Sequence, residues 1–212
     1  MKRVFTITLV LLAALLFPGT GLRAQTPEEI LEKMSAQMDR GETEGFTMDL
    51  NMKIPIVGTI TSHNMSRGDK LKGTASGADK STTYWTDKTT KWTYDPQKNE
   101  ITIENNTPSE SSSDDDDMKA FDSLNNGYDI TLQKETAEAW YFVCKKNKTN
   151  KVKDDPKKIE LAVSKATFLP IYLKTKQSLI TISIENYTLG VSEKSVTFNM
   201  ADFPTATVVD KR

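Results

Sequence analysis

The sequence is poor in the residue types on which disulfide bonds, metal sites and catalysis most often depend. Its 212 residues include one cysteine, Cys144, and one histidine, His63. A single cysteine excludes an internal disulfide and any zinc site with several cysteine ligands, so the fold has to rest on a hydrophobic core. A chain of this length can supply such a core in one domain.

Sequence motifs of catalysis are also missing. No glycine-rich phosphate loop, GxSxG elbow or HExxH helix occurs. His63 lies in the polar segment 61–64, which favours an exposed histidine over a general base or metal ligand. Cys144 follows Trp140 and Phe142 in alternating phase, which favours a buried, inert thiol over a reactive one. We therefore expect no enzymatic activity, metal or cofactor. The sequence leaves open whether the fold brings two carboxylates together.

Residues 1–24 have the pattern of a secretory signal peptide. Basic residues precede an apolar stretch, Val4–Phe17, that is shorter than the ~20 residues needed to cross a bilayer. Cleavage after Ala24 leaves residues 25–212 as the mature domain, although Leu22 is larger than the residue usual at that position. No cysteine stands directly after this site, where a lipid anchor would need one, so we expect an exported protein without a lipid anchor.

Acidic and basic residues nearly balance. Without the leader, 25 basic residues face 29 acidic ones, a net charge of −4. This balance gives no indication of nucleic acid or an anionic membrane surface as a partner. Acids and Pro156 interrupt the basic stretch 145–158, and no aromatic residues interleave it, which favours an exposed hairpin loop over a binding patch.

A helix is predicted at the start of the mature chain. Thr26 can cap it, Pro27 suits its first position and Glu29 completes a capping box. Apolar residues recur at helical spacing, which predicts an amphipathic helix of about 13 residues that ends at Gly41. The apolar stripe consists of Ile30, Leu31, Met34 and Met38.

From Phe46 the sequence period changes to two. Apolar residues alternate with polar ones as far as Ile54, which predicts a half-buried antiparallel strand. Asp95–Asn99 has the composition of a turn. The whole pattern predicts one α+β domain dominated by an antiparallel sheet of about ten strands. Further strands are predicted at 59–65, 82–86, 91–94, 100–103, 128–132, 139–145, 158–163, 168–174, 178–186 and 195–199.

Residues 105–117 form a polar stretch with four consecutive aspartates. Calcium loops alternate their ligands with spacers and need a glycine turn, so a solvated loop is favoured over a calcium site. Met118, Phe121 and Leu124 then form an apolar stripe, which predicts a second amphipathic helix at about 116–126. The aspartates would oppose the positive N-terminus of that helix.

A set of apolar side chains shares the inward phases of these strands and helices. An ordinary filled core explains the set; alternatively, a curved sheet and two Met-lined helices enclose a cavity, since flexible thioethers can repack around acyl chains of different shape. The candidate cavity residues are Met34, Phe46, Met48, Leu50, Met52, Trp92, Tyr94, Met118, Phe121 and Phe142.

Two parts of the chain resemble the outer-membrane lipoprotein carrier (LolA-like) family. Tyr84–Pro96 resembles the family's stretch in which a turn leads to an aromatic residue, a spacer, a tyrosine and an acidic residue with proline. With the first helix and strand, the likeness covers nearly all of residues 25–212. The C-terminal match is carried, in order, by 168–170, 179–182, 185–187, 198–200, 203–204 and 208–210.

This resemblance implies an unclosed antiparallel half-barrel with helices over its concave face. It implies a monomeric, non-enzymatic periplasmic carrier without a cofactor, which holds the acyl chains of lipoproteins inside. Its partners would be the acylated cargo, an inner-membrane donor and an outer-membrane acceptor. Relatives with the same half-barrel bind other lipids or sense mislocalised ones, so a sensor or protein-binding domain with a filled core is the alternative.

The family also has an arginine on an early strand that hydrogen-bonds to the lid helices in the closed state. By position it matches Arg67, although Gly68 stands where the family usually has proline. One guanidinium can serve several carbonyl acceptors, so a lid latch is plausible. The alternative is an exposed loop arginine.

Overall fold

The computed structural model describes residues 25–77, 80–107, 124, 127–153 and 155–212. Two helices open the described chain, α2 (Pro27–Asp39) and the short α3 (Gly41–Glu44), and α5 (Glu193–Val196) and the 3-10 helix η1 (Met200–Asp202) lie near its end. The strands are β1 (Phe46–Ile54), β2 (Gly58–Arg67), β3 (Lys70–Gly77), β4 (Lys80–Thr86), β5 (Thr90–Asp95), β6 (Glu100–Asn105), β7 (Tyr128–Glu135), β8 (Ala139–Lys146), β9 (Lys158–Ser164), β10 (Pro170–Gln177), β11 (Ile180–Leu189) and β12 (Thr207–Asp210).

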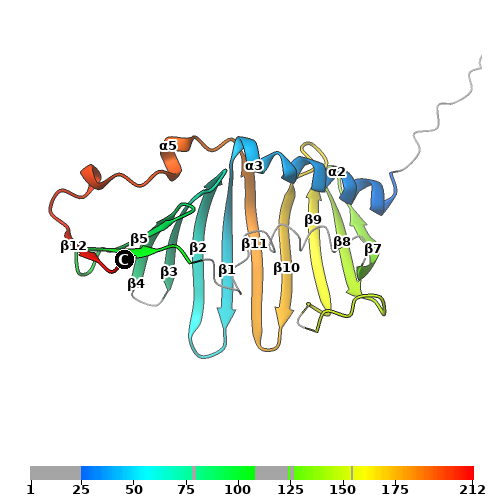
Figure 1. The fold of residues 1–212 in the computed structure, drawn as a ribbon. Coiled ribbons are helices and arrows are strands. Elements are labelled where there is room, and N and C mark those ends of the chain that lie inside the picture. The colour runs from blue at the N-terminus through cyan, green and yellow to red at the C-terminus, as the bar shows by residue number, and fades with distance from the viewer. Residues whose placement is uncertain (1–24, 78–79, 108–123, 125–126, 154) are drawn as a thin grey trace, which may run out of the picture.

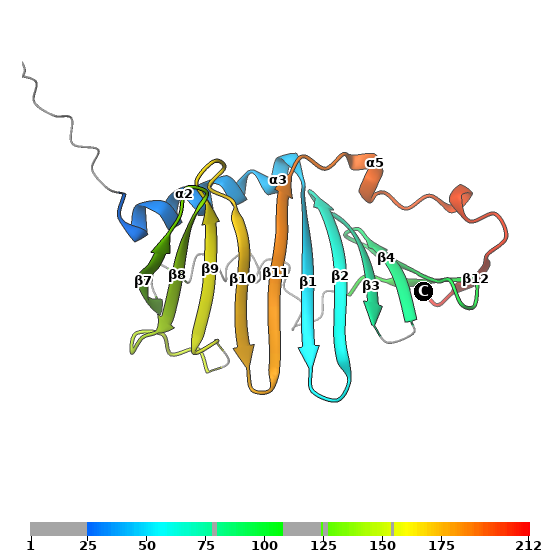
Figure 2. The same ribbon diagram turned by 180° about the vertical axis from the view of Figure 1, so that it is seen from behind.

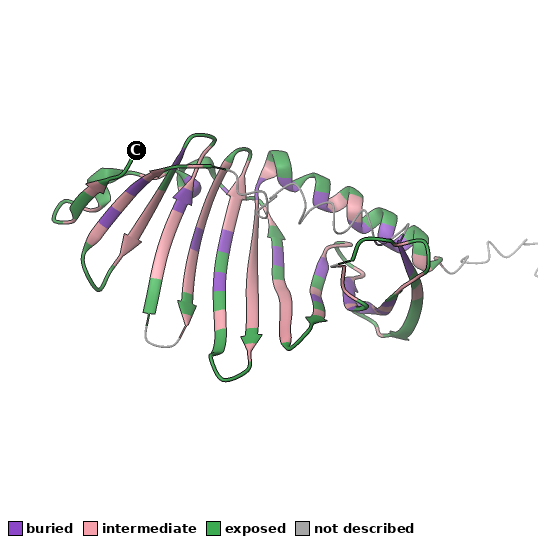
Figure 3. Cartoon of the chain, turned by 60° about the horizontal axis from the view of Figure 1, so that its bottom comes forward, coloured by how far each residue is buried: buried purple, intermediate pink, exposed green. Residues whose placement is uncertain are grey.

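All twelve strands form one open sheet in the order β12-β6-β5-β4-β3-β2-β1-β11-β10-β9-β8-β7 (Figures 1 and 2). The pairing of β12 with β6 is parallel, and the other neighbours are antiparallel. Figure 3 shows the curvature of the sheet from edge to edge. The predicted α+β class and the unclosed half-barrel are therefore confirmed.

The main hydrophobic core lies between α2 and the β7–β11 half of the sheet. We call the sheet face that α2 covers the inner face and the other the outer face. The stripe on α2 is buried as predicted, and the capping box forms, with Glu29 N–H donating to Thr26 Oγ1 over 3.2 Å. This core contains Ile30, Leu31, Met34, Met38, Leu124, Tyr128, Trp140, Phe142, Cys144, Ile159, Leu161, Val163, Leu173 and Tyr187.

A second apolar cluster lies at the opposite end of the sheet, under the C-terminal segment. Phe198 stacks on Trp92 with ring centroids 5.0 Å apart and meets the edge of Trp85 at 5.4 Å. Phe203 packs on Tyr94 at 4.7 Å. Edge-on and stacked aromatic pairs of this kind add about 0.5–1.5 kcal/mol each beyond their buried area. The C-terminal segment is thereby held across the strands before it enters the sheet as β12.

The prediction and the structure differ in three elements. Strand β3 was not predicted, because its sequence KLKGTASG has no regular apolar alternation. Residues 195–199 were predicted as a strand, but Ser192 caps the short helix α5 with its side chain and the chain then runs outside the sheet. Strand β12 was also missed. Of the predicted helix 116–126 only Leu124 lies within the described residues, where it is buried.

The corner between α3 and β1 joins the helices to the ends of two central strands. The Glu44 carbonyl accepts from Val191 N–H at 3.0 Å, and the Gly45 carbonyl accepts from Gly190 N–H at 2.9 Å. Gly45 has φ +75°, and a Cβ there would lie 2.7 Å from the Ser66 carbonyl oxygen. Only glycine fits this position without displacing a neighbouring strand.

We expect Gly45→Ala to lower the free energy of unfolding by at least about 3 kcal/mol, since it adds a backbone clash to the cost of a left-handed conformation. Gly68→Ala is the matched control: φ is +58° there, but no atom lies within 4 Å of the added Cβ. That variant should lose about 1–2 kcal/mol. Urea unfolding measures both, and equal losses would show that the corner is not tightly packed.

Candidate functional site

Apolar side chains cross the inner face in two rows that run from strand to strand. Residues paired across neighbouring strands project to the same face, so the register fixes each row. The first row runs through Leu50, Ile184, Leu173, Leu161 and Phe142. The second row contains Met52, Ile182, Thr175, Ile159, Cys144 and Ile130.

Helix α2 covers this apolar field with its own apolar stripe. Met34 and Met38 are buried in the same cluster as Phe142, while Phe46 and Met48 pack against it at the β1 side. Leu50 and Met52 share the face and are half-buried. Six of the candidate cavity residues are therefore on or over the inner face, counting Met34 from the helix and Phe142 from β8. Met118 and Phe121 lie outside the described residues.

Trp92 and Tyr94 do not belong to the inner face, contrary to the prediction. Trp92 pairs with Trp85, Trp85 with Lys72, Lys72 with Met65, and Met65 with Thr47. Thr47 alternates with Phe46 and Met48 on β1, so all five of these paired residues lie on the outer face. The two aromatic residues serve the second cluster under the C-terminal segment instead.

Beyond β1, toward β6, the inner face becomes polar. Met48 is paired with Asn64, Asn64 with Gly73, and Gly73 with Tyr84. The Tyr84 hydroxyl donates to Asn64 Oδ1 at 2.8 Å, and the Ser62 hydroxyl donates to the same oxygen at 3.0 Å. Asn64 is only 4% exposed, so this network is enclosed. Among the described residues, the continuous rows of apolar side chains therefore run across β1 and β7–β11.

Arg67 lies at the corner that anchors the helices. One guanidinium nitrogen, Nη1, donates to the Val191 carbonyl at 2.5 Å and, more weakly, to the Glu44 carbonyl at 3.5 Å. Glu44 ends α3, so the side chain ties the end of β2 to the helices and to the segment after β11. Arg67 is half-buried rather than an exposed loop residue.

Gly68 occupies a turn that a proline could not form. Its N–H donates to the Glu42 carbonyl at 3.2 Å, and its φ is +58°. Proline has no N–H and is fixed near φ −65°, so it could neither make this bond nor adopt this turn. The glycine gives the β2 end a second tie to α3.

Tyr187 was not singled out by the sequence, although it lies in the centre of the site. The β1–β11 register shifts between Thr47 and Asp49, and Asn186 has φ +56°, as in a β-bulge. The bulge lets Ile184 and Tyr187 both face inward. Tyr187 stacks on Phe46 at 5.2 Å, and its buried hydroxyl has no hydrogen-bond partner among the described residues. Strand alternation alone gives no sign of a bulge.

The outer face over the same strands is polar. Asp49 accepts from Asn186 Nδ2 at 2.7 Å and lies 2.7 Å from His63 Nδ1, and these contacts hold the pKa of the Asp49 carboxyl below its usual range. His63 itself is exposed. Among the described residues no group of three or more His, Cys, Asp or Glu side chains could hold a metal ion.

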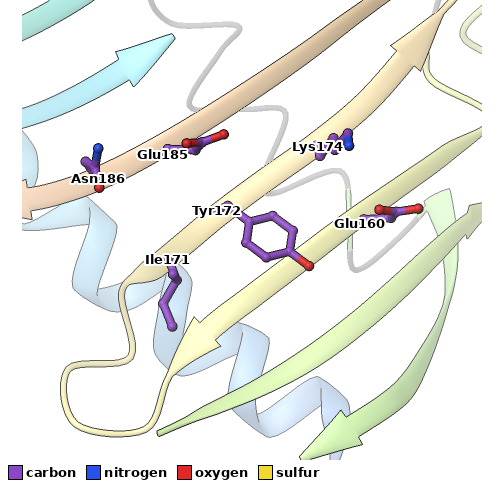
Figure 4. Close-up of a pocket in the computed structure, with 6 residues that line it drawn as sticks. All are labelled: Glu160, Ile171, Tyr172, Lys174, Glu185 and Asn186. Atoms are coloured by element: carbon purple, nitrogen blue, oxygen red, sulfur yellow. The ribbon is translucent and has the colours of Figure 1, made fainter. Parts of the chain in front are cut away.

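A shallow hollow of about 410 Å³ also lies on this outer side (Figure 4). Figure 4 shows its side chains on the side of the sheet away from α2. It mixes acidic, basic and aromatic groups and has no apolar floor suited to an acyl chain. The hollow is lined by Glu160, Ile171, Tyr172, Lys174, Glu185 and Asn186.

No protein-family model matches this chain, and no curated protein sequence is similar to it. Several solved structures are similar to it. The lipoprotein LppX from Mycobacterium tuberculosis matches with a TM-score of 0.48 and 6% identity, over 77% of this chain and 95% of that one. A MucA/MucB complex from Pseudomonas aeruginosa matches with a TM-score of 0.46 and 12% identity, over 81% of this chain and 60% of that one.

A LolA superfamily protein from Nitrosomonas europaea matches with a TM-score of 0.31 and 10% identity, over 82% of this chain and 99% of that one. All three TM-scores lie below 0.5, so these structures say nothing about what this chain binds. In the part of the chain that the structure describes, no helix is long and apolar enough to span a membrane.

Tyr187→Phe should leave the free energy of unfolding unchanged or raise it by up to about 1 kcal/mol, because it removes a buried hydroxyl that has no partner. Tyr128→Phe is the comparison: its hydroxyl donates to the Pro156 carbonyl at 2.9 Å, and losing that bond should cost about 1 kcal/mol. Urea unfolding of both variants decides. A loss at Tyr187 as large as that at Tyr128 would mean that the Tyr187 hydroxyl is bonded in solution.

Burial raises the pKa of the Cys144 thiol to about 11. The folded thiol is therefore protonated at pH 8, and we expect it to react with a disulfide reagent at least ~100-fold more slowly than in the urea-unfolded chain, where its pKa is about 8.5. The unfolded thiol ionises first, so stability should also fall as the pH rises from about 8.5 toward 11. Rapid labelling of the folded protein at pH 8 would contradict the burial of Cys144.

Proposed function

We propose that this protein is a non-enzymatic periplasmic carrier that binds the acyl chains of a lipoprotein, or of another lipid, on the inner face beneath α2. The observation that carries the proposal is the match between two apolar surfaces: the α2 stripe and the two rows that cross β1 and β7–β11. The cargo would come from an inner-membrane donor and pass to an outer-membrane acceptor. The predicted leader, residues 1–24, lies outside the described residues and supplies the export that this role requires.

The free energies of apolar burial support a role in which an acyl chain replaces α2 on the sheet. Burying one large apolar side chain contributes about 1.5–3 kcal/mol, so displacing the four apolar residues of α2 costs roughly 6–12 kcal/mol. An acyl chain of about 14 methylenes gains ~11 kcal/mol at 0.8 kcal/mol per methylene. One chain can thus offset the loss of the helix, and a cargo with several chains binds more strongly than α2 does. Release then needs an acceptor with a better site.

The attachment of α2 also supports a lid that can move. The ties at the corner, from Arg67, Gly68, Gly190 and Val191, all act on residues 42–45 at the C-terminal end of the helical segment. The buried stripe of α2 itself consists of apolar side chains. The helix can therefore leave the sheet while its C-terminal end stays anchored.

A fluorescent fatty acid titrated into the protein tests the site. Met52→Glu places a charge in the second inner row and should weaken binding at least ~10-fold, because a carboxylate is costly beside an acyl chain. Lys53→Glu is the matched control on the next residue, which is exposed and faces outward, and it should bind like the unmodified chain. Equal binding by both variants would place the lipid elsewhere.

Cys144 provides an independent readout, because it is the sole cysteine and lies in the second inner row. Bound acyl chains should slow its alkylation, and Arg67→Ala should speed it in the unliganded protein by loosening the corner. Mass spectrometry of lipids extracted from the purified protein would name the cargo class. A protein that carries no lipid and does not bind the fluorescent fatty acid would instead be the filled-core sensor or protein-binding domain.

A further inference from the structure

Large apolar side chains project from the end of the sheet that lies farthest from α2 and α3. Ile56 and Val57 form the β1–β2 hairpin tip and are 107% and 61% exposed, and Leu179 in the β10–β11 hairpin is 71% exposed. Figures 1 and 2 show the two hairpins projecting side by side from the same end. Pairing of Lys53 with Thr181 makes β1 and β11 direct neighbours there.

Turn chemistry does not explain these residues. Ile56 has φ +71°, a left-handed conformation that a β-branched residue adopts only under strain and that Gly, Asn or Asp fill readily. Its side chain touches none of the core, so the isoleucine brings no packing in return. Unexplained strain at an exposed tip is typical of a residue with a function outside the fold.

Positive charge collects at the same end. Lys53 and Lys176 flank the two tips. The adjoining stretch 145–158, which contains the loop after β8, has seven lysines and two aspartates. Val152 in this loop is 59% exposed. Glu160, the acid on β9 next to this stretch, is already paired with Lys158 at 2.7 Å.

The loop and the β10–β11 hairpin also lie against each other. One surface hollow of about 320 Å³ is lined by residues of both, among them Lys157, Lys158, Lys176 and Thr181. The basic loop, although distant in sequence, is thus part of the same end as the apolar tips. The net charge of −1 for the whole chain hides this segregation.

We propose that this end docks on an anionic lipid bilayer surface, with Ile56, Val57 and Leu179 inserted at the boundary of headgroups and acyl chains. Apolar side chains that insert beside lysines that contact anionic headgroups are the combination that holds proteins at such an interface. Three apolar side chains on two hairpin tips make the binding weak and reversible. The proposal goes beyond acyl-chain carriage and does not depend on it, because the tips lie at the end of the sheet away from α2.

Vesicle sedimentation tests the docking, with vesicles of phosphatidylcholine containing about one third phosphatidylglycerol and with pure phosphatidylcholine vesicles. The protein should bind the anionic vesicles and lose that binding as salt rises, because the lysine contacts are screened. The double variant Ile56→Asp, Leu179→Asp should reduce the partition coefficient at least ~10-fold. Aspartate accepts the left-handed conformation at position 56, so this variant should fold as well as the original.

Ile171→Asp is the matched control: it also replaces an exposed apolar residue, 43% exposed and at the opposite end of β10, and should bind vesicles normally. Lys53→Gln with Lys176→Gln should weaken binding to anionic vesicles and flatten its salt dependence. Equal loss in the Ile171 control would overturn the proposal, as would no binding of the unmodified protein at low salt, which would leave the tips to a protein partner. Uptake of the fluorescent fatty acid should be unchanged in the tip variants, which separates this test from that of the carrier.

Discussion

Pairing register in one continuous sheet is the constraint on which the rest of the structure depends. Each cross-strand pair carries its face to the next strand, so the assignment of Met48 to the inner face determines the face of every residue out to β6. The same register that gathers Leu50, Leu173 and Phe142 under α2 places Trp85 and Trp92 on the other side. Among the described residues, the consequence is that two segments cover opposite faces, α2 at one end of the sheet and the C-terminal segment at the other.

Dimensions explain why one helix cannot cover the whole face. A helix of 13 residues is about 20 Å long at 1.5 Å per residue, while neighbouring strands are about 4.8 Å apart. Helix α2 therefore spans about four strand spacings of a twelve-stranded sheet. The inner face is apolar where the helix lies and polar beyond it, at Ser62, Asn64 and Tyr84. The inward-facing residues of each strand are thus apolar where α2 can cover them and polar where it cannot.

Local patterns predicted the parts of this fold that depend on one segment. The capping box at Thr26, the stripe on α2 and the alternation of β1 each need only a few neighbouring residues, and the structure has all three. The face of Trp92 could not be predicted in that way, because it depends on the register of four intervening pairings. One of the strands involved, β3, has Gly73 and Ala75 where an apolar alternation would have revealed it. The prediction missed Tyr187 for a related reason, because a bulge reverses the alternation between it and Ile184.

Charge shows the same gap between sequence and space. Averaged over the chain, acids and bases cancel, and the stretch 145–158 considered alone has the composition of an exposed loop. In the sheet, this loop lies beside the β10–β11 hairpin. The next hairpin along the sheet carries the strained tip at Ile56. Apolar tips and lysines that lie between residues 53 and 179 of the sequence become one surface. That surface lies away from the corner at Gly45 that anchors the helices, so the proposed contact with a bilayer leaves α2 uncovered. In the proposed carrier, an acyl chain is exchanged beneath α2 while the other end of the sheet rests on the membrane.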